Sequence, residues 1–285
     1  ERRRDHRAVE VQTRAIETLH TALANDRLHH AFIFFGPAGV GKFTTARALG
    51  KVLLCHDAQR DLMGRIEACG ACESCRLLRD DADTDASAHP DLHVIRKELA
   101  GFSSNAQLRS RKQLNLPLDL LRERMLGGKT GDDRTHEAIV YRTAALRHGK
   151  VFIIDEAELL DPNGQNALLK TLEEPPGNTY IILVTSQEHR LLSTIRSRCH
   201  RVGFGPLPDD VVEDWISANR GGVAGRDRDW LVRFADGSIG RAALAADYDL
   251  LEWGRTVEPA LDAMRKGKPP VQLGADMADR IKAFA

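Results

Sequence analysis

A short apolar run leads directly into a glycine-rich loop and then into a helical pattern, and this order restricts the fold more than any other feature. Residues 31–35 are all apolar, residues 36–42 read Gly-Pro-Ala-Gly-Val-Gly-Lys, and apolar positions recur at helical spacing after them. The loop fits the first seven positions of the phosphate-binding pattern G-x-x-x-x-G-K-[ST]. Glycines let successive backbone N–H groups turn toward phosphate oxygens, and the helix N-terminus adds a partial positive charge. The alternative is a glycine-rich turn that merely opens a structural helix.

One position of this loop departs from the pattern. Phe43 stands where a Ser or Thr hydroxyl would ligate Mg²⁺. Thr44 follows, but it lies about 100° further round a helix and is a poor replacement. We therefore expect ATP or ADP with Mg²⁺ to be held weakly, and hydrolysis to suffer more than binding. The expected nucleotide-binding residues of the loop are Gly36, Gly39, Gly41, Lys42 and Thr44.

A second apolar run ends in two carboxylates. Residues 151–154 are apolar, and Asp155 and Glu156 follow them. In phosphate-loop ATPases, the first such carboxylate holds Mg²⁺ and the second polarises the attacking water. Acidic residues in the first turn of a structural helix are the alternative. Together with the upstream loop, the pair indicates a nucleotide site.

Apolar runs and helical patterns alternate along the first two thirds of the chain. The runs predict buried strands at 31–35, 92–95, 151–154 and 180–184, with helices at about 137–147 and 165–174 among those between them. This alternation predicts an α/β fold with a parallel sheet. After about residue 205 the strand signal fades and helical patterns follow. The predicted domains are an α/β domain at 1–204 with a polar, partly ordered insertion at about 96–134, a helical lid at 205–250, and a short linker and helix within 251–285.

Four of the five cysteines fall within 21 residues, as Cys55, Cys69, Cys72 and Cys75. Four thiolates complete a tetrahedral Zn²⁺ site and leave no open position, so the spacing predicts a structural ion in a module at about 55–75. The alternatives are four unpaired thiols in a surface loop, or His56 or His89 in place of one cysteine. Clustered cysteines without an apolar secretory signal favour a reducing compartment, and we expect the cytoplasm.

Charge and aromatic content limit the direct partners. Lys+Arg and Asp+Glu both number 41, and aromatic residues make up 5% of the chain. This balance argues against a broadly basic surface or stacking platforms for single strands. A zinc-dependent DNA-binding module is therefore disfavoured. No apolar run is long enough to span a membrane.

Taken together, these motifs resemble the clamp-loader subunits of bacterial DNA polymerase III, which are AAA+ proteins. The resemblance covers about residues 9–245. It implies a nucleotide-binding domain with an inserted zinc module, a helical lid and the start of a C-terminal collar that joins five subunits into a ring. The implied partners are gamma/tau and delta subunits, with the sliding clamp and primer-template DNA reached through the complex, near the nucleoid during replication. Other segments that carry the resemblance are 89–93, 155–158, 166–176 and 197–199.

Within this family the sequence motifs are more similar to those of the delta-prime branch than to those of the ATP-hydrolysing gamma/tau branch. The resemblance implies a stator with little or no ATPase activity of its own, inside a DNA polymerase holoenzyme. It implies that Arg198 acts as an arginine finger on a neighbour's ATP, that Thr185 is a sensor-one residue and that Arg241 is the sensor-two arginine. The alternatives are an Arg198 paired with a nearby carboxylate, a strand-ending Thr185 and a solvated Arg241. A gamma/tau-like motor is the alternative function.

Overall fold

The computed structural model describes residues 13–284 except 26, 62–63, 79–87, 111, 113, 224 and 268–271. The chain divides into two compact units, Glu1–Pro206 and Leu207–Ala285, and each is described by itself. None of the helices in the described part of the chain has both the length and the apolar character needed to cross a bilayer.

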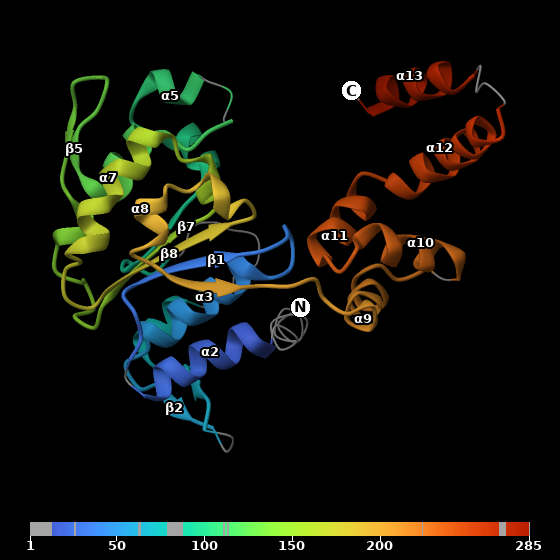
Figure 1. Cartoon of the computed structure of the whole chain (residues 1–285). Coiled ribbons are helices and arrows are strands. Elements are labelled where there is room, and N and C mark those ends of the chain that lie inside the picture. The colour runs from blue at the N-terminus through green and yellow to red at the C-terminus, as the bar shows by residue number, and fades with distance from the viewer. Residues whose placement is uncertain are drawn as a thin grey trace. The chain divides into compact units, whose positions relative to one another are not determined.

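The first unit is built on a five-stranded sheet with the strand order β4-β7-β8-β1-β9 (Figure 1). Every neighbouring pair is parallel, which confirms the predicted α/β class. The edge strand β9 was missed because only Val202 within it is buried, so it has no apolar run. The strands are β1 Ala31–Phe35, β4 Leu92–Ile95, β7 Lys150–Ile154, β8 Thr179–Thr185 and β9 His200–Gly203.

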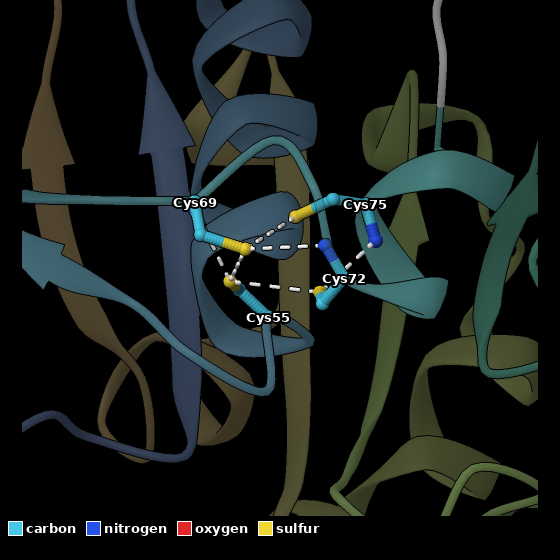
Figure 2. A group of neighbouring side chains, drawn as sticks. All are labelled: Cys55, Cys69, Cys72 and Cys75. Carbon is cyan, nitrogen blue, oxygen red and sulfur yellow. Dashed lines mark hydrogen bonds between the residues drawn. The ribbon is translucent and has the colours of Figure 1, made fainter.

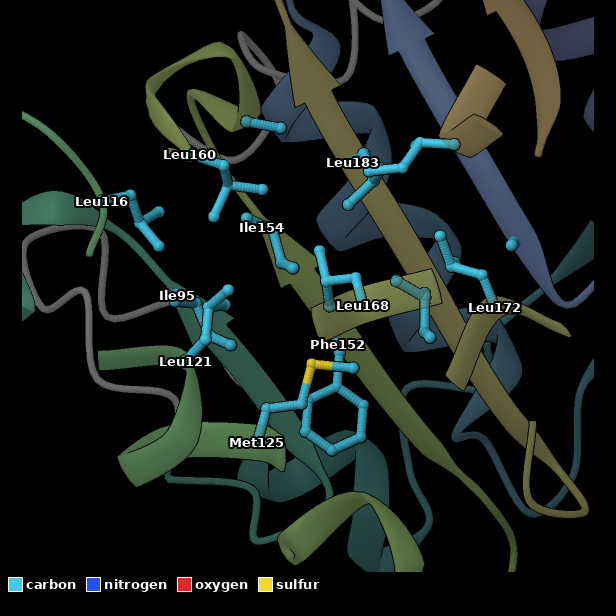
Figure 3. Packing of buried hydrophobic residues seen from close by; sticks show 14 of the residues in the cluster. Ile95, Leu116, Leu121, Met125, Phe152, Ile154, Leu160, Leu168, Leu172 and Leu183 are labelled. Atoms are coloured by element: carbon cyan, nitrogen blue, oxygen red, sulfur yellow. The ribbon is translucent and has the colours of Figure 1, made fainter. Parts of the chain in front are cut away.

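Both faces of the sheet are buried. In β1, Ile33 belongs to one hydrophobic cluster and Phe32 to another, because successive side chains of a strand point to opposite faces. Figure 3 shows the first cluster, to which Met125 and Phe152 both belong. Helices α6 and α7 contribute to this cluster, and helices α2 and α3 to the other. Their bounds are α2 Thr13–Ala24, α3 Lys42–Leu53, α6 Leu118–Leu121 and α7 Pro162–Glu173.

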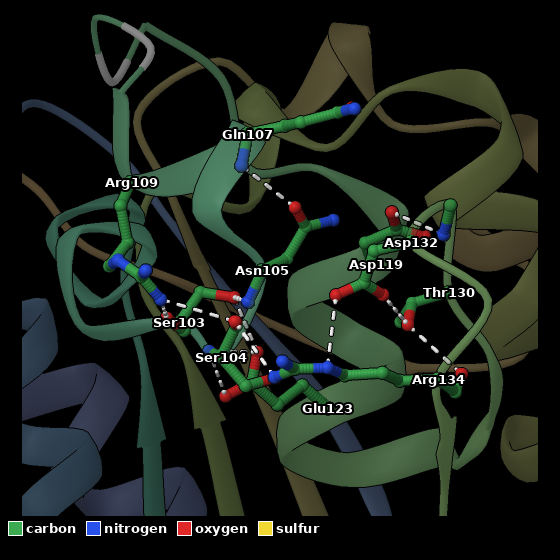
Figure 4. A network of polar contacts seen from close by, with 11 residues as sticks. Ser103, Ser104, Asn105, Gln107, Arg109, Asp119, Glu123, Thr130, Asp132 and Arg134 are labelled. Carbon is green, nitrogen blue, oxygen red and sulfur yellow. Dashed lines mark hydrogen bonds and ion pairs between the residues drawn. The ribbon is translucent and has the colours of Figure 1, made fainter.

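The stretch predicted as a partly ordered insertion at 96–134 is folded where it is described. Its apolar residues Leu116, Leu120, Leu121 and Met125 are fully buried in the first core cluster. Polar contacts organise the rest (Figure 4): Glu123 accepts hydrogen bonds from the Ser103 hydroxyl and the Ser104 N–H. The composition concealed this order because only a few apolar side chains tie the segment to the core. Its elements are η1 Lys97–Phe102, α5 Ala106–Ser110, α6, η2 Arg122–Leu126 and the hairpin β5 Gly128–Lys129 and β6 Thr135–His136.

The helix predicted at 137–147 was wrong. Only a short turn, η3 Ile139–Tyr141, forms there. The buried amine of Lys150 donates hydrogen bonds to three carbonyls of this stretch. The carboxylate of Asp91 accepts hydrogen bonds from two backbone N–H groups of the same stretch. Side-chain contacts from residues outside the stretch therefore replace the backbone hydrogen bonds of a helix.

The remaining elements of the first unit are short. The cysteine-rich segment forms the hairpin β2 Gln59–Arg60 and β3 Ile66–Glu67 and the helix α4 Glu73–Leu77. Turns η4 Ala157–Leu159 and η5 Glu188–Arg190 and the helix α8 Ser193–Arg196 follow the later strands. The cysteine-rich segment carries Cys69, Cys72 and Cys75, and Arg198 lies just after α8.

The second unit is helical throughout its described residues. The helices are α9 Asp209–Asn219, α10 Arg226–Ala235, α11 Ile239–Asp247, α12 Leu250–Arg265 and α13 Leu273–Phe284. The linker predicted around residues 266–270 lies largely outside the described residues. The assignment of this unit to a lid and the start of a collar stays a prediction.

Candidate phosphate loop and metal centre

The glycine-rich loop runs from the end of β1 to the start of α3, in the strand–loop–helix order that the sequence predicted. Gly36, Gly39 and Gly41 all have positive φ, at 142°, 72° and 96°. A Cβ on Gly36 would lie 2.1 Å from the carbonyl oxygen of Phe204. The loop therefore requires glycine both for its backbone conformation and for its close packing against the next segment.

Lys42 is buried at the start of α3, with 6% of its surface exposed. Its amine donates to the carbonyls of Gly36 at 2.8 Å and Pro37 at 2.5 Å. Burial lowers the pKa of the Lys42 amine, and the nearby carboxylates of Glu158 and Asp155 oppose this shift. The amine thus lies inside the loop, bonded to its first two carbonyls, at a position from which it could reach a phosphate group.

The carboxyl ends of neighbouring strands bring the other candidate residues to the same edge of the sheet. Thr185 ends β8 and lies opposite Phe35, the last residue before the loop. It is buried, and its hydroxyl accepts the N–H of Gln187 at 3.0 Å. A polar residue at this position could sense a ligand in the loop, as expected for sensor one.

Glu158 is a further polar residue near the loop, and the sequence reading gave it no role. Its Oε1 accepts the hydroxyl of Ser186 at 2.5 Å and the backbone N–H of Ser186 at 3.1 Å. Burial alone would raise the pKa of Glu158, but hydrogen bonds from Ser186 and Thr185 lower it overall. Glu158 is therefore a buried anion bonded to the segment after β8, and its charge acts on the amine of Lys42.

Asp155, the first carboxylate after β7, pairs with an arginine of the same chain. Arg96 Nε lies 3.2 Å from Asp155 Oδ2, and the Arg96 guanidinium carbon lies 3.9 Å from the centroid of the Phe43 ring. Burial raises the pKa of Asp155, whereas the charge of Arg96 opposes this shift. One guanidinium thus contacts both positions from which a phosphate-loop protein would ligate Mg²⁺.

Glu156, the second carboxylate, is also paired. Lys97 Nζ lies 2.8 Å from Glu156 Oε1, and this hydrogen bond raises the pKa of Lys97. The sequence reading missed both Arg96 and Lys97. They follow the predicted strand at 92–95 just as the two carboxylates follow 151–154, and this parallel could have revealed them.

The residues at this edge do not fit a bound Mg²⁺. The ion takes near-octahedral oxygen ligands, commonly one or two carboxylates together with substrate phosphates. Phe43 offers no oxygen, and the carboxylate of Asp155 is engaged by Arg96. The glycine-rich loop is therefore present without the metal ligands that a hydrolytic site requires.

The four clustered cysteines converge on one point, as Figure 2 shows. Their Sγ atoms all lie within 4.8 Å of one another, and the separations between Cys55 and Cys69, Cys55 and Cys72, and Cys69 and Cys75 are 3.5, 3.9 and 4.0 Å. Sulfur atoms placed about 2.3 Å from one Zn²⁺ in a tetrahedron lie about 3.8 Å apart. The cluster could therefore hold a metal ion.

Backbone N–H groups donate hydrogen bonds to three of the four sulfur atoms. The N–H of Cys69 points to Cys55 Sγ at 3.3 Å, that of Cys72 to Cys69 Sγ at 3.3 Å, and that of Cys75 to Cys72 Sγ at 3.4 Å. Burial would raise the pKa of Cys72, but such hydrogen bonds lower it to about 6. Such donors favour thiolate, which is the form that binds metal, whereas burial raises the pKa of Cys55 and raises that of Cys75 to about 12.

Neither histidine considered as a substitute ligand joins the sulfur atoms. Among the described residues, the group of converging ligand atoms contains the four sulfurs and no imidazole nitrogen. His89 is buried instead beside α4, where its Nε2 lies 2.9 Å from the hydroxyl of Ser74. Its Nδ1 accepts the N–H of Asp91. His89 thus ties the cysteine-rich segment to the start of β4.

Arg198 lies just after α8 and is engaged within the chain. Its guanidinium lies 2.5 Å from Glu173 Oε1 and donates to the carbonyl of Thr194 at 2.9 Å. The side chain is 35% exposed. The local ion pair weighed for Arg198 is therefore present, and a role in a neighbouring site would require Arg198 to exchange Glu173 for phosphate.

Two further candidate residues, Thr44 and Arg241, take no part in the contacts described so far. Thr44 is half-buried at the second residue beyond Lys42 in α3. Arg241 belongs to the second unit, where its guanidinium lies 3.4 Å from Asp236 Oδ2 and over the ring of Phe234. Their nucleotide-binding roles stay predictions.

Comparison with known proteins places the chain in one family. The family model described as DNA polymerase III, delta subunit, matches residues 11–208. The delta' subunit of Bacillus subtilis is 34% identical over 206 residues, which cover 72% of this chain and 51% of that protein. The delta' subunit of Pseudomonas aeruginosa is 35% identical over 66% of this chain and 47% of that protein. The chain thus spans about half the length of these relatives.

Other similarities are weaker. The tau subunit of Bacillus subtilis is 30% identical over 70% of this chain and 29% of that protein. Among solved structures, a DNA polymerase III gamma subunit-related protein from Thermotoga maritima matches 81% of this chain and 56% of that chain, with 20% identity and a TM-score of 0.43. A structural match with that TM-score does not support a conclusion about function.

Proposed function

The chain belongs to the DNA polymerase III, delta subunit, family, and from this premise we propose that it is a delta-prime-like stator of the bacterial clamp loader. In this role it helps to load the sliding clamp onto primed DNA without being the motor. Its partners are gamma/tau and delta subunits in a five-membered ring, and it meets the clamp and primer-template DNA through that ring. Its compartment is the cytoplasm, at the nucleoid during replication.

One observation carries the choice of stator over motor. Both carboxylates that would serve hydrolysis, Asp155 and Glu156, are paired with cations of the same chain. Phe43 also removes the metal-binding hydroxyl. A site without metal ligands and with its water-activating carboxylate engaged is unsuited to phosphoryl transfer. The ATP hydrolysed by the complex is therefore bound by other subunits.

Arg198 contributes to chemistry in the neighbouring subunit. A guanidinium is permanently charged, and its planar fork matches the oxygens of a phosphate group. In the isolated chain, Glu173 neutralises Arg198 at a partly exposed position. On assembly the γ-phosphate of the neighbour replaces Glu173, so that Arg198 stabilises the charge that develops during hydrolysis.

The cysteine cluster holds Zn²⁺ in a structural role. Four thiolates favour Zn²⁺ over harder cations, and a fourfold protein ligand set leaves no position for a catalytic water. The ion joins the end of α3 to α4 through Cys55 and Cys75, both of which are buried. Zinc thus fixes the segment that connects the loop helix to β4.

A gamma/tau-like motor is the second candidate, supported by the 30% identity to a tau subunit. The two functions differ in ATPase activity, and this difference provides the test. The stator predicts that the purified chain with primed DNA shows no ATP turnover above that of its Lys42→Ala variant, and that it binds purified motor subunits. Turnover that requires Lys42 would establish the motor instead. Failure to bind motor subunits would reject both.

A further inference from the structure

The carboxyl edge of the sheet carries two ion pairs that follow directly from strand register. Strands β4 and β7 are parallel, and Ile95 lies opposite Ile154 at their ends. The backbone ladder continues one step further, because the N–H of Asp155 donates to the carbonyl of Ile95 at 3.0 Å. Arg96 and Asp155 therefore emerge side by side, and Lys97 and Glu156 follow them. The sheet itself thus positions two cations against the two carboxylates.

Arg96 occupies the place between the two metal-ligating positions. Its guanidinium carbon lies 3.9 Å from the centroid of the Phe43 ring, and its Nε lies 3.2 Å from Asp155. An aromatic face attracts a cation, so the residue that removes the metal ligand also creates a binding surface for the guanidinium. Arg96 and Asp155 remain 21% and 19% exposed, so that solvent and solutes can reach the pair.

This arrangement changes what the edge can bind. A Mg²⁺ ion would have to displace Arg96 from Asp155, and it would find no hydroxyl at residue 43. Mg²⁺ loses its hydration shell reluctantly and needs near-ideal oxygen geometry, so this exchange is unfavourable. A guanidinium, by contrast, binds phosphate oxygens well and is charged at every physiological pH. The positive charge that a metal would supply is already part of the chain.

We propose that Arg96 replaces the divalent cation, so that the loop binds the phosphates of a nucleoside di- or triphosphate without Mg²⁺. This inference rests on the proposed function, in which the loop is a nucleotide site that does not hydrolyse. The loop N–H groups and Lys42 hold the phosphates from one side, and Arg96 neutralises them from the other. Lys97 keeps Glu156 paired, so that the bound nucleotide persists.

Calorimetric titration of the purified chain with ADP and with ATP tests this inference, in a buffer freed of Mg²⁺ by passage over a chelating resin, so that the zinc of the protein is retained, and in excess Mg²⁺. The expected dissociation constants in the two buffers agree within about threefold. Arg96→Ala should weaken binding in the Mg²⁺-free buffer by about tenfold or more, because it removes a charge-assisted contact. Arg142→Ala is the matched control, since Arg142 forms an exposed ion pair with Glu137. It should bind as the unmodified chain does.

A double variant keeps the test decisive if Arg96→Ala alone is poorly folded. Phe43→Thr combined with Arg96→Ala restores the hydroxyl and frees Asp155, so binding should become tighter in Mg²⁺ by about tenfold or more. The inference is overturned if Mg²⁺ tightens binding by the unmodified chain to that extent, or if neither nucleotide binds in either buffer. Such a failure would leave assembly with the motor subunits intact, whereas failure of the stator role would abolish it.

Discussion

At Gly36 the phosphate loop passes so close to the segment after β9 that no side chain fits between them. Gly36→Ala should lower the free energy of unfolding by more than about 3 kcal/mol, because the new Cβ would lie 2.1 Å from the Phe204 carbonyl oxygen. Gly41→Ala is the matched control: its φ is 96°, but nothing lies within 4 Å of the place that its new Cβ would take. It should cost only the strain of a positive φ, about 1–2 kcal/mol.

Urea unfolding of both variants measures this difference. If Gly36→Ala and Gly41→Ala lower the free energy of unfolding equally, then backbone conformation alone, and not the approach of Phe204, requires glycine at residue 36. The loop conformation itself could be predicted from the glycine spacing. The contact with Phe204 could not, because it depends on β9, which has no apolar run.

At Phe43 the sequence indicates what is lost, and the structure shows what replaces it. The missing hydroxyl follows from a comparison with the loop pattern alone. The compensating Arg96 lies 53 residues away along the chain, at the end of another strand. Its contact with Phe43 depends on the order β4-β7-β8-β1-β9, which no local pattern contains. Residue identity therefore predicted the defect, whereas tertiary structure was needed to find the substitute cation.

Among the elements, the cysteine-rich segment gives the clearest prediction about metal. The purified chain should contain about one Zn²⁺, and Cys72→Ser should lose it because a tetrahedral thiolate site needs all four ligands. Loss of the ion should lower the melting temperature by about 5 °C or more. Elemental analysis and a thermal scan measure the two effects.

Cys199→Ala is the control for that substitution. Cys199 is buried away from the four converging sulfurs, and burial raises the pKa of its thiol to about 12. The variant should keep its full zinc content. A zinc content near zero in the unmodified chain, or an unchanged content in Cys72→Ser, would contradict the assignment of the metal.

Strand β4 carries a half-buried imidazole, that of His93, which makes stability depend on pH. Burial lowers the pKa of His93 to about 4 from 6.5, and its ring stacks on Phe152. As the pH falls below 6.5, His93 becomes protonated in the unfolded chain, whereas in the folded chain it stays neutral until about pH 4. Stability is therefore lost over that window as the pH falls, and this group alone contributes about 2 kcal/mol between roughly pH 7 and pH 5.

Comparison with His93→Gln isolates this contribution from that of the cysteine ligands, which also take up protons in acid. Urea unfolding at the two pH values should show a smaller loss in His93→Gln than in the unmodified chain. The same loss in both proteins would show that His93 does not titrate between them. The other histidines with lowered pKa values, His20, His29 and His89, should contribute in the same direction.

The elements that the sequence predicted correctly are those whose own residues determine them. All four strands with apolar runs were found, as was the helix at 165–174, which begins at an Asp161 N-cap. The helix predicted at 137–147 failed because the side chains of Lys150 and Asp91, which lie outside it, form hydrogen bonds with its backbone groups. Local pattern predicts an element well only where no distant side chain competes for its hydrogen bonds.

For the molecule as a whole, the proposed function assigns different sites of action to two cations: Lys42 acts in its own chain and Arg198 in the adjoining subunit. Lys42 is directed inward to the loop of its own chain, where its amine meets the carbonyls of Gly36 and Pro37. Arg198 is partly exposed and held by a single carboxylate, that of Glu173. A stator needs Arg198 more than Lys42, because its chemistry takes place in the adjoining subunit. A motor would need Lys42 more.

The most direct test therefore compares Arg198→Ala and Lys42→Ala in a reconstituted clamp loader, by DNA-stimulated ATPase and clamp-loading rates. Arg198→Ala should slow hydrolysis at the adjoining site by roughly 10³-fold or more. Lys42→Ala should change the rate by less than about twofold, and so should the neighbouring control Arg196→Ala. A larger loss in Lys42→Ala than in Arg198→Ala would contradict the stator role and identify the chain as a motor.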